Sequence, residues 1–184
     1  MKAVLLDRDG TIIVDPPDDR VDSVEKIRLL PSTVPALLCL AKHGYGIIII
    51  TNQTNIAQGR ITEPQFWFIN SVIVAYLESS GISVLKTYVC PHGTQDDCAC
   101  RKPKPQLLLQ AALEFTLNPR DTYMVGDRLS DIEAANNAKM KAVLVKTGKF
   151  PVVTSTNNTT YTADDLLDAA EFIVSHQSGS ATNN

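Results

Sequence analysis

Two aspartates follow the first apolar run of the chain. Residues 3–6 read Ala-Val-Leu-Leu, and Asp7 and Asp9 come next, in the sequence Asp-Arg-Asp-Gly-Thr. The apolar run predicts a strand buried on both faces, and ligands of open α/β sheets bind beyond the carboxyl ends of such strands. Carboxylates at that position can attack an electrophile, transfer a proton or bind a hard cation, which prefers oxygen ligands.

The same five residues have two less specific interpretations. An Asp-x-Asp-Gly sequence can form an ordinary turn stabilised by Asx hydrogen bonds. It can also begin a calcium-binding loop, but that loop needs Gly at its sixth position and Glu at its twelfth, where this chain has Ile12 and Asp18. The rest of the chain must decide between an ordinary turn and a catalytic site.

Further polar groups follow three other predicted strands. They are Thr51 after residues 46–50, Lys102 in the loop after residues 84–89, and Asp127 after residues 121–125. Right-handed crossovers place the carboxyl ends of parallel strands at one edge of a sheet. We therefore expect these three residues to meet Asp7 at that edge.

The expected cluster fits a phosphoryl group. The carboxylates of Asp7, Asp9 and Asp127 would repel one another unless a cation neutralises them, and a hard divalent cation with few protein ligands suggests magnesium. Arg101 and Lys102 add positive charge, which phosphoryl transfer requires beside accurate positioning. A basic run can instead be a solvated or nucleic-acid-binding segment, but the net charge of −3 argues against nucleic acid.

A second cluster lies within eleven residues. Cys90, His92, Cys98 and Cys100 offer four soft or borderline ligands in an otherwise polar loop. This set suits tetrahedral zinc, and because all four positions are protein ligands we expect a structural ion, not a catalytic one.

Strands and helices alternate along the chain. We predict strands at residues 3–6, 46–50, 84–89, 121–125 and 141–145, and helices that begin at Ser32 or Thr33 as N-cap, at Thr62, at Pro105, at Asp131 and at Ala163. Residues 12–30 should form a loop or flap over the site, and residues 154–162 a loop. The alternation predicts an α/β fold of three layers, with a mostly parallel sheet covered on both faces.

Composition agrees with one globular domain. The chain has 184 residues, of which 44% are hydrophobic and 20% charged, and no apolar run approaches the length of a membrane helix. We expect a single domain over residues 1–176 and a disordered tail at residues 177–184. A strand that starts after two residues leaves no room for a signal peptide, so we expect a cytoplasmic protein. The net charge of −3 argues against a nucleic-acid or anionic-membrane partner, and we expect a monomer.

Four segments resemble, in order, the motifs of the haloacid dehalogenase superfamily of phosphatases: Asp7-x-Asp9-Gly10-Thr11, Thr51-Asn52-Gln53, Lys102-Pro103 and Gly126-Asp127-x-x-x-Asp131. The resemblance covers about residues 2–148. The cysteine-rich segment at residues 90–103 is similar to the branch that holds D-glycero-D-manno-heptose 1,7-bisphosphate phosphatase and histidinol-phosphate phosphatase. The resemblance implies a Rossmann-like three-layer sandwich that has a zinc-binding loop and no large cap domain.

The resemblance also implies roles for the residues that match. Asp7 would be the nucleophile that forms an aspartyl-phosphate, and Asp9 the acid and then the base. Thr51 and Lys102 would hold phosphate oxygens. Magnesium would be bound by Asp7, Asp127 and the main-chain carbonyl of Asp9.

Four further positions have supporting roles in this comparison. Asp131 would orient the metal site from outside its ligand shell, and Asn52, Arg101 and Arg128 would contact the substrate, a small phosphomonoester.

The chain departs from the heptose branch after the second strand. The usual Thr-Asn-Gln-Ser-Gly-Ile-Ala-Arg-Gly has Asn55 in place of its Gly and Gln58 in place of its Arg, so a cation is missing unless Arg60 replaces it. The resemblance favours heptose bisphosphate as substrate, with histidinol phosphate as the alternative. A phosphate-binding protein without catalysis is the alternative from another class, since fold does not fix function.

Overall fold

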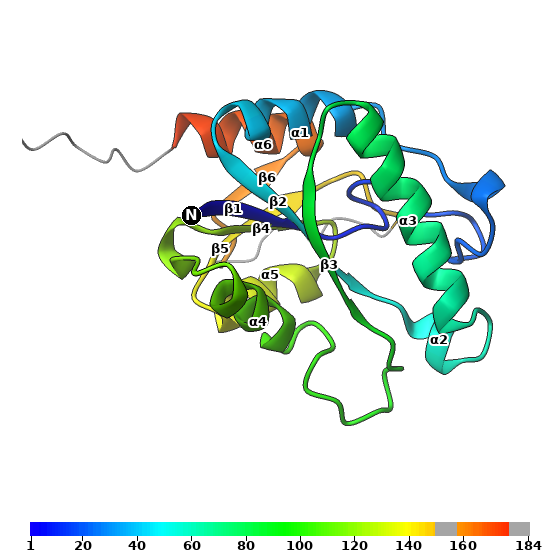
Figure 1. The fold of residues 1–184 in the computed structure, drawn as a ribbon. Coiled ribbons are helices and arrows are strands. Elements are labelled where there is room, and N and C mark those ends of the chain that lie inside the picture. The colour runs from blue at the N-terminus through cyan, green and yellow to red at the C-terminus, as the bar shows by residue number, and fades with distance from the viewer. Residues whose placement is uncertain (150–157, 177–184) are drawn as a thin grey trace, which may run out of the picture.

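A parallel sheet of six strands forms the centre of the molecule (Figure 1). The structure is a computed structural model and describes residues 1–149 and 158–176. The strand order is β3-β2-β1-β4-β5-β6, and every neighbouring pair is parallel. The strands are β1 (Lys2–Leu6), β2 (Tyr45–Asn52), β3 (Val84–Cys90), β4 (Tyr123–Gly126), β5 (Lys141–Val145) and β6 (Tyr161–Ala163).

Helices cover both faces of this sheet and complete the three predicted layers. Helices α1, α3 and α6 pack on one face, and α4 and α5 on the other. None of the helices in the described residues is long and apolar enough to cross a membrane. The helices are α1 (Thr33–Lys42), α2 (Thr54–Ala57), α3 (Glu63–Ser79), α4 (Gln106–Glu114), α5 (Leu129–Asn137) and α6 (Leu166–Ser175), with short 3-10 turns η1 (Val24–Lys26) and η2 (Pro119–Asp121).

Strand β1 lies in the middle of the sheet and contributes side chains to both hydrophobic cores. Val4 and Leu6 point into the core under α1, α3 and α6, and Ala3 and Leu5 into the core under α4 and α5. All four side chains are fully buried. Burying one Val or Leu side chain stabilises the fold by roughly 1.5–3 kcal/mol relative to leaving it exposed. This burial fixes β1 in the sheet and therefore fixes the point at which the chain reaches Asp7.

One strand of the sheet was not predicted from the sequence. Residues 161–163 were expected at the end of a loop and the start of a helix, but they form β6, in which Tyr161 pairs with Val143 of β5. Helix α6 begins later, at Leu166, and Asp165 caps it by accepting from the N–H groups of Leu167 and Asp168. Three residues are too few to show a strand period. The predicted loop partly, and the predicted disordered tail entirely, lie outside the described residues.

One predicted helix start was wrong, and another was confirmed without the capping hydrogen bond that we expected. Helix α5 begins at Leu129, so Asp131 is its third residue, and the Asp131 carboxylate accepts from the Arg128 N–H at 3.0 Å. Ser32 stands at the N-cap of α1 but makes no capping hydrogen bond, while Thr33 Oγ1 donates to the Ile12 carbonyl at 2.7 Å. A tertiary contact to the segment after β1 therefore replaces the expected local cap.

The segment after β1 is a flap that folds back on itself. The N–H of Val14 donates to the Arg28 carbonyl at 2.8 Å, and that of Leu30 to the Ile12 carbonyl at 3.1 Å. Only the 3-10 turn η1 interrupts it. No inserted helical domain lies between the strands in residues 1–149 and 158–176, as the sequence analysis expected.

Candidate active site

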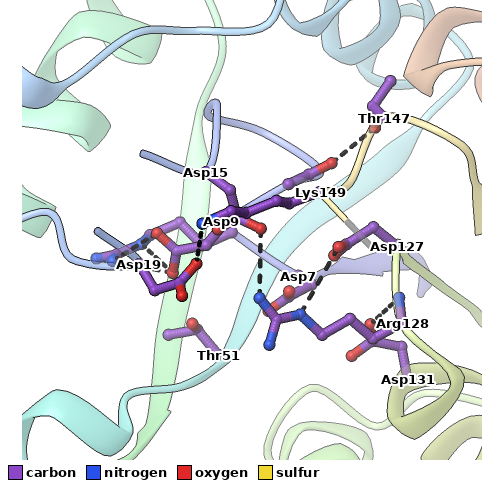
Figure 2. Close-up of polar contacts among 12 residues, drawn as sticks. Asp7, Asp9, Asp15, Asp19, Thr51, Asp127, Arg128, Asp131, Thr147 and Lys149 are labelled. Carbon is purple, nitrogen blue, oxygen red and sulfur yellow. Dashed lines mark hydrogen bonds and ion pairs between the residues drawn. The ribbon is translucent and has the colours of Figure 1, made fainter. Parts of the chain in front are cut away.

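The predicted residues meet beyond the carboxyl ends of the central strands (Figure 2). Asp7 follows β1, Thr51 is the penultimate residue of β2, and Asp127 follows β4. Lys102 reaches the same place from the loop between β3 and α4, and its Nζ donates to Asp7 Oδ1 at 2.8 Å. The expected convergence is confirmed.

Lys102 is a buried cation of this site, with 3% of its surface exposed. Its Nζ also donates to the Ile50 carbonyl at 2.8 Å and lies 2.6 Å from Asp131 Oδ1. Burial opposes the charged ammonium, but the carboxylates of Asp131 and Asp7 outweigh it and raise the pKa of Lys102. The lysine therefore stays charged across the physiological range.

Asn52 holds the main chain of that lysine. Its Oδ1 accepts from the Lys102 N–H and its Nδ2 donates to the Lys102 carbonyl, each at 3.1 Å. Asn52 also lines the cavity above the site. Both of its polar groups are already engaged with the protein, so its first role is to position Lys102.

Three carboxylates form a site that could hold a metal ion. Asp7, Asp127 and Asp131 each place an oxygen within 4.8 Å of the others. Neither oxygen of buried Asp127 accepts a hydrogen bond, and its ion-pair partner Arg128 Nε is 3.7 Å away. Buried oxygens without partners, next to other carboxylates, are the ligands that a hard divalent cation prefers.

The pKa values of Asp127 and Asp7 reflect the same crowding of carboxylates. Burial raises the pKa of Asp127 to about 8, and the charges of Asp7 and Asp131 add to the effect. Burial also raises the pKa of Asp7 to about 6; Lys102 opposes the rise, whereas Asp131 and Asp9 add to it. A bound cation would remove this penalty on the charged forms.

Glycines surround these carboxylates. A Cβ at Gly10 would lie 2.6 Å from the Asp127 carboxylate, and a Cβ at Gly148 would overlap Asp127 from another side. A Cβ at Gly126 would overlap Asp131 in the same way. Gly10 also has a φ of +82°, which L-residues rarely adopt. These close approaches could not be predicted from the sequence, because the contacts that the glycines permit are tertiary.

Asp9 and Thr51 are linked by Gln53. Gln53 Nε2 donates to Asp9 Oδ2 at 2.7 Å and to Thr51 Oγ1 at 2.9 Å. Arg8 also donates to the Asp9 carboxylate. Thr51 is 1% exposed. Neither Arg8 nor Gln53 was predicted to act on Asp9. The position of an arginine between two aspartates was the one sequence feature that could have indicated the contact of Arg8.

The four predicted soft ligands also come together. One ligand atom from each of Cys90, His92, Cys98 and Cys100 lies within 4.8 Å of the others. The Cys90 and Cys98 sulfurs are 3.8 Å apart, and His92 Nδ1 is 3.2 Å from Cys100 Sγ. Burial raises the pKa of the Cys90 thiol to about 12, so a cation is needed to keep it ionised there. The cluster could hold a metal ion.

Two predicted arginines lie at the cavity wall and are held by the protein. Arg101 Nη1 donates to Thr54 Oγ1 at 2.7 Å and to the His92 carbonyl at 3.2 Å, which joins it to the cysteine loop. Arg128 Nη2 donates to Asp15 Oδ2 at 3.3 Å, across the site from Asp127 (Figure 2).

A cavity of about 480 Å³ opens above these groups. Its residues come from the flap, the segment after β2, the cysteine loop and the start of α5. Acidic lining residues are Asp7, Asp9, Asp15, Asp19 and Asp131, and basic ones are Arg60, Arg101, Lys102 and Arg128. A volume of this size suits a small polar molecule.

Comparisons with known proteins find relatives whose names agree with the chemistry of this site. The family model described as HAD-hydrolase-like matches residues 99–169. D-glycero-beta-D-manno-heptose-1,7-bisphosphate 7-phosphatase of Pasteurella multocida is 36% identical over 94% of this chain and 96% of its own. The histidine biosynthesis bifunctional protein HisB of Legionella pneumophila is 38% identical over 74% of this chain and 39% of its own.

Solved structures give the same result. The D,D-heptose 1,7-bisphosphate phosphatase from B. bronchiseptica, solved with magnesium and phosphate, superposes with a TM-score of 0.87 at 30% identity, over 95% of this chain and 99% of its own. Fold, motif order and relatives together define a phosphatase, and the chain belongs to the haloacid dehalogenase superfamily. Its branch there is the one that holds the heptose 1,7-bisphosphate phosphatases and the histidinol-phosphate phosphatases.

Proposed function

We propose that this phosphatase removes one phosphate from D-glycero-D-manno-heptose 1,7-bisphosphate through an aspartyl-phosphate on Asp7. The observation that carries the proposal is the cavity itself. Asp7, Lys102 and Asp131 lie along it, and Arg60, Arg101 and Arg128 line it as well. The charges of Asp7, Lys102 and Asp131 suit the phosphoryl group that reacts. The three arginines suit a second phosphate on the same molecule.

The reaction takes two steps. Asp7 attacks phosphorus, the bond from phosphorus to the sugar oxygen breaks, and Asp9 gives that oxygen a proton. In the second step Asp9 takes a proton from water, which attacks the aspartyl-phosphate and releases inorganic phosphate and free Asp7. Lys102 and Thr51 bind the phosphoryl oxygens, whose charge must be stabilised throughout.

The carboxylate site fits magnesium. Asp7 and Asp127 would be its side-chain ligands, with the Asp9 carbonyl, and Asp131 would act through Lys102, with which it forms an ion pair. When bound, magnesium would neutralise charge on the carboxylates and on the phosphoryl oxygens. The unpartnered oxygens of Asp127 support this assignment.

The cysteine cluster fits structural zinc. A tetrahedral zinc ion with bonds of about 2.3 Å holds its sulfur ligands about 3.8 Å apart. The Cys90–Cys98 sulfur distance of 3.8 Å matches this spacing, and the Cys90–Cys100 distance of 3.0 Å is shorter, so the main support is the set of four soft or borderline ligands. Four protein ligands leave no position for water or substrate, so the ion would order the loop that leads to Arg101.

Histidinol phosphate is the second candidate substrate. It carries a cationic amine, and the cavity is also lined by Asp15 and Asp19, which suit a cation. Arg128 and Lys149 already pair with these two carboxylates, which reduces their attraction for an amine. A cytoplasmic location and a monomeric state stay predictions from the sequence.

A phosphate-release screen tests the proposal. The protein with magnesium is offered the heptose bisphosphate, histidinol phosphate and an aryl phosphate, and the kcat/KM values are compared. We expect the bisphosphate to have the highest value, with one equivalent of phosphate released. Preference for histidinol phosphate would favour the second candidate, and no hydrolysis of any ester would favour a binding protein.

Stability should depend on pH in a way that magnesium changes. The pKa values of about 6 for Asp7 and about 8 for Asp127 lie above the ordinary 3.8, so the folded protein binds protons more tightly than the unfolded chain. The free energy of unfolding should therefore fall as pH rises from about 4 to 8. Magnesium, which favours the ionised carboxylates, should make this fall smaller.

The measurement is urea unfolding at several pH values, with and without added magnesium. The Asp127→Asn variant is the control, because it removes the carboxylate with the highest pKa of the pair. It should show a weaker pH dependence and little response to magnesium. Identical pH dependence of the wild type with and without magnesium would contradict the assignment of this site.

Loss of zinc should lower activity without unfolding the sheet. Cys98→Ser removes one ligand, and the Arg101 contact to the His92 carbonyl depends on that loop. Misplacing a substrate-binding group by about 1 Å can cost on the order of 100-fold in rate. Lys102 is anchored separately by Asn52 and Ile50, so we expect the loss mainly in KM.

Steady-state kinetics and circular dichroism on one sample check this expectation. Cys39→Ser is the matched control, since Cys39 lies in α1, far along the chain from the cysteine cluster. Unchanged kinetics with zinc absent would show that the loop does not position Arg101. Global unfolding would show that zinc stabilises the whole domain.

A further inference from the structure

Arg8 stands between the two aspartates of the first motif, and its side chain is 1% exposed. Burying a guanidinium is costly unless it is paired and hydrogen-bonded. Here Nε and Nη2 donate to Asp9 Oδ2 at 3.2 and 3.0 Å, and Nη2 also approaches Oδ1 at 3.0 Å. The ring of Phe66, from α3, lies 5.1 Å from the guanidinium carbon. The arginine is thus fixed by two groups.

The two oxygens of Asp9 are not equivalent. Oδ2 accepts from Arg8 Nε, from Arg8 Nη2 and from Gln53 Nε2. Within the described residues, Oδ1 accepts from Arg8 Nη2 alone. A carboxylate oxygen has about two lone-pair sites, so Oδ2 is fully used and Oδ1 keeps capacity for a proton. Asp9 also lines the cavity, where a substrate would lie.

We propose that Arg8 is a positioning residue for the proton transfers: with Gln53 it fixes the Asp9 carboxylate so that Oδ1 carries the transferred proton. The inference rests on the proposed function, because it assigns an atom to the acid–base role of Asp9. In the first step the bond between phosphorus and the alcohol oxygen breaks, its electron pair stays on that oxygen, and the proton moves there from Oδ1. In the second step a proton of water returns to Oδ1.

Arginine suits this task better than lysine. Its planar fork binds a carboxylate through two nitrogens and sets the rotation of the carboxylate, whereas an ammonium binds as a point charge. The aromatic ring on one side restricts the guanidinium further. Arg8→Lys should therefore keep the charge but recover only part of the function, and Arg8→Met should lose both.

The test uses two leaving groups. A sugar phosphate leaves as an alkoxide and needs a proton, whereas a nitrophenyl phosphate leaves as a stable anion without one. The value of kcat/KM reports only the first step, in which the leaving group departs. Arg8→Met should lower kcat/KM for the sugar phosphate about 100-fold, and for the nitrophenyl ester by a much smaller factor. A role in folding alone would lower both equally.

A double-variant cycle tests whether Arg8 acts through Asp9. In an Asp9→Asn background, Arg8→Met should cause no further loss with the sugar phosphate, because the group it positions is gone. Thermal melting checks the fold of each variant. If Arg8→Met does not fold, Gln53→Met removes the other donor to Oδ2 and should give the same dependence on leaving group.

Two results would overturn the inference: equal losses for both esters, or a further loss in the Asp9→Asn background. A wild-type protein that hydrolyses neither ester would instead overturn the proposed function.

Discussion

Asp7→Asn should abolish turnover while the domain stays folded. The amide oxygen is uncharged and a far weaker nucleophile than a carboxylate oxygen, and removing a catalytic nucleophile can cost on the order of 10⁶-fold in kcat. The substitution keeps the shape of the side chain. It also removes one of three crowded carboxylates, so the protein without magnesium should be at least as stable as the wild type.

Phosphate release and urea unfolding on the same preparations check both parts. Asp164→Asn is the control, since Asp164 is an exposed carboxylate paired with Lys146 and outside the cavity. Mass spectrometry of wild-type protein quenched during turnover should find a phosphorylated peptide that contains Asp7, and Asp7→Asn should lack it. A folded Asp7→Asn protein with substantial activity would exclude the covalent mechanism.

Lys102→Met should destroy both activity and stability. The ammonium is the buried cation between Asp7 and Asp131, at 2.8 and 2.6 Å. Removing one partner of a buried ion pair costs about 3–5 kcal/mol, because the remaining charges stay desolvated. The carboxylates left behind are charged at high pH and neutral at low pH, so the destabilisation should be larger at pH 8 than at pH 5.

Unfolding experiments at the two pH values, together with phosphate release, measure these effects. Lys104→Met is the matched control, two residues further on, where the lysine is exposed and pairs with Asp97. The double variant Lys102→Met with Asp131→Asn should recover stability but no activity. Normal turnover by the single variant would show that Lys102 does not bind the phosphoryl group.

The sequence was most informative where a predicted strand ends at a polar residue. Asp7, Thr51 and Asp127 each come at or just after the end of such a strand, and the rule that parallel strands end at one edge was enough to bring them together. The cysteine loop was recognised for a related reason: the ligand types and their spacing lie within one short segment. Both inferences needed only local pattern and a general rule of topology.

Contacts between distant segments were not predictable in this way. Gly148 permits the position of Asp127, and Gln53 joins Asp9 to Thr51, but nothing near these residues names the partner. Strand β6 was missed because three residues carry no measurable period, and it forms only by pairing with β5. Roles assigned by resemblance, such as acid–base chemistry at Asp9, stay predictions until the variants are measured.

The central place of β1 has a consequence for the order in which the chain can fold. Val4 pairs with Ile47 on one side and with Tyr123 on the other. During synthesis β1, β2 and β3 leave the ribosome first, yet one edge of β1 stays open until β4 arrives. An open apolar strand edge invites pairing with other chains, so this interval is when the nascent protein is most exposed to aggregation. The pairing of β4 with β1 also brings Asp127 to the site. During refolding, activity should therefore first appear when β4 pairs with β1.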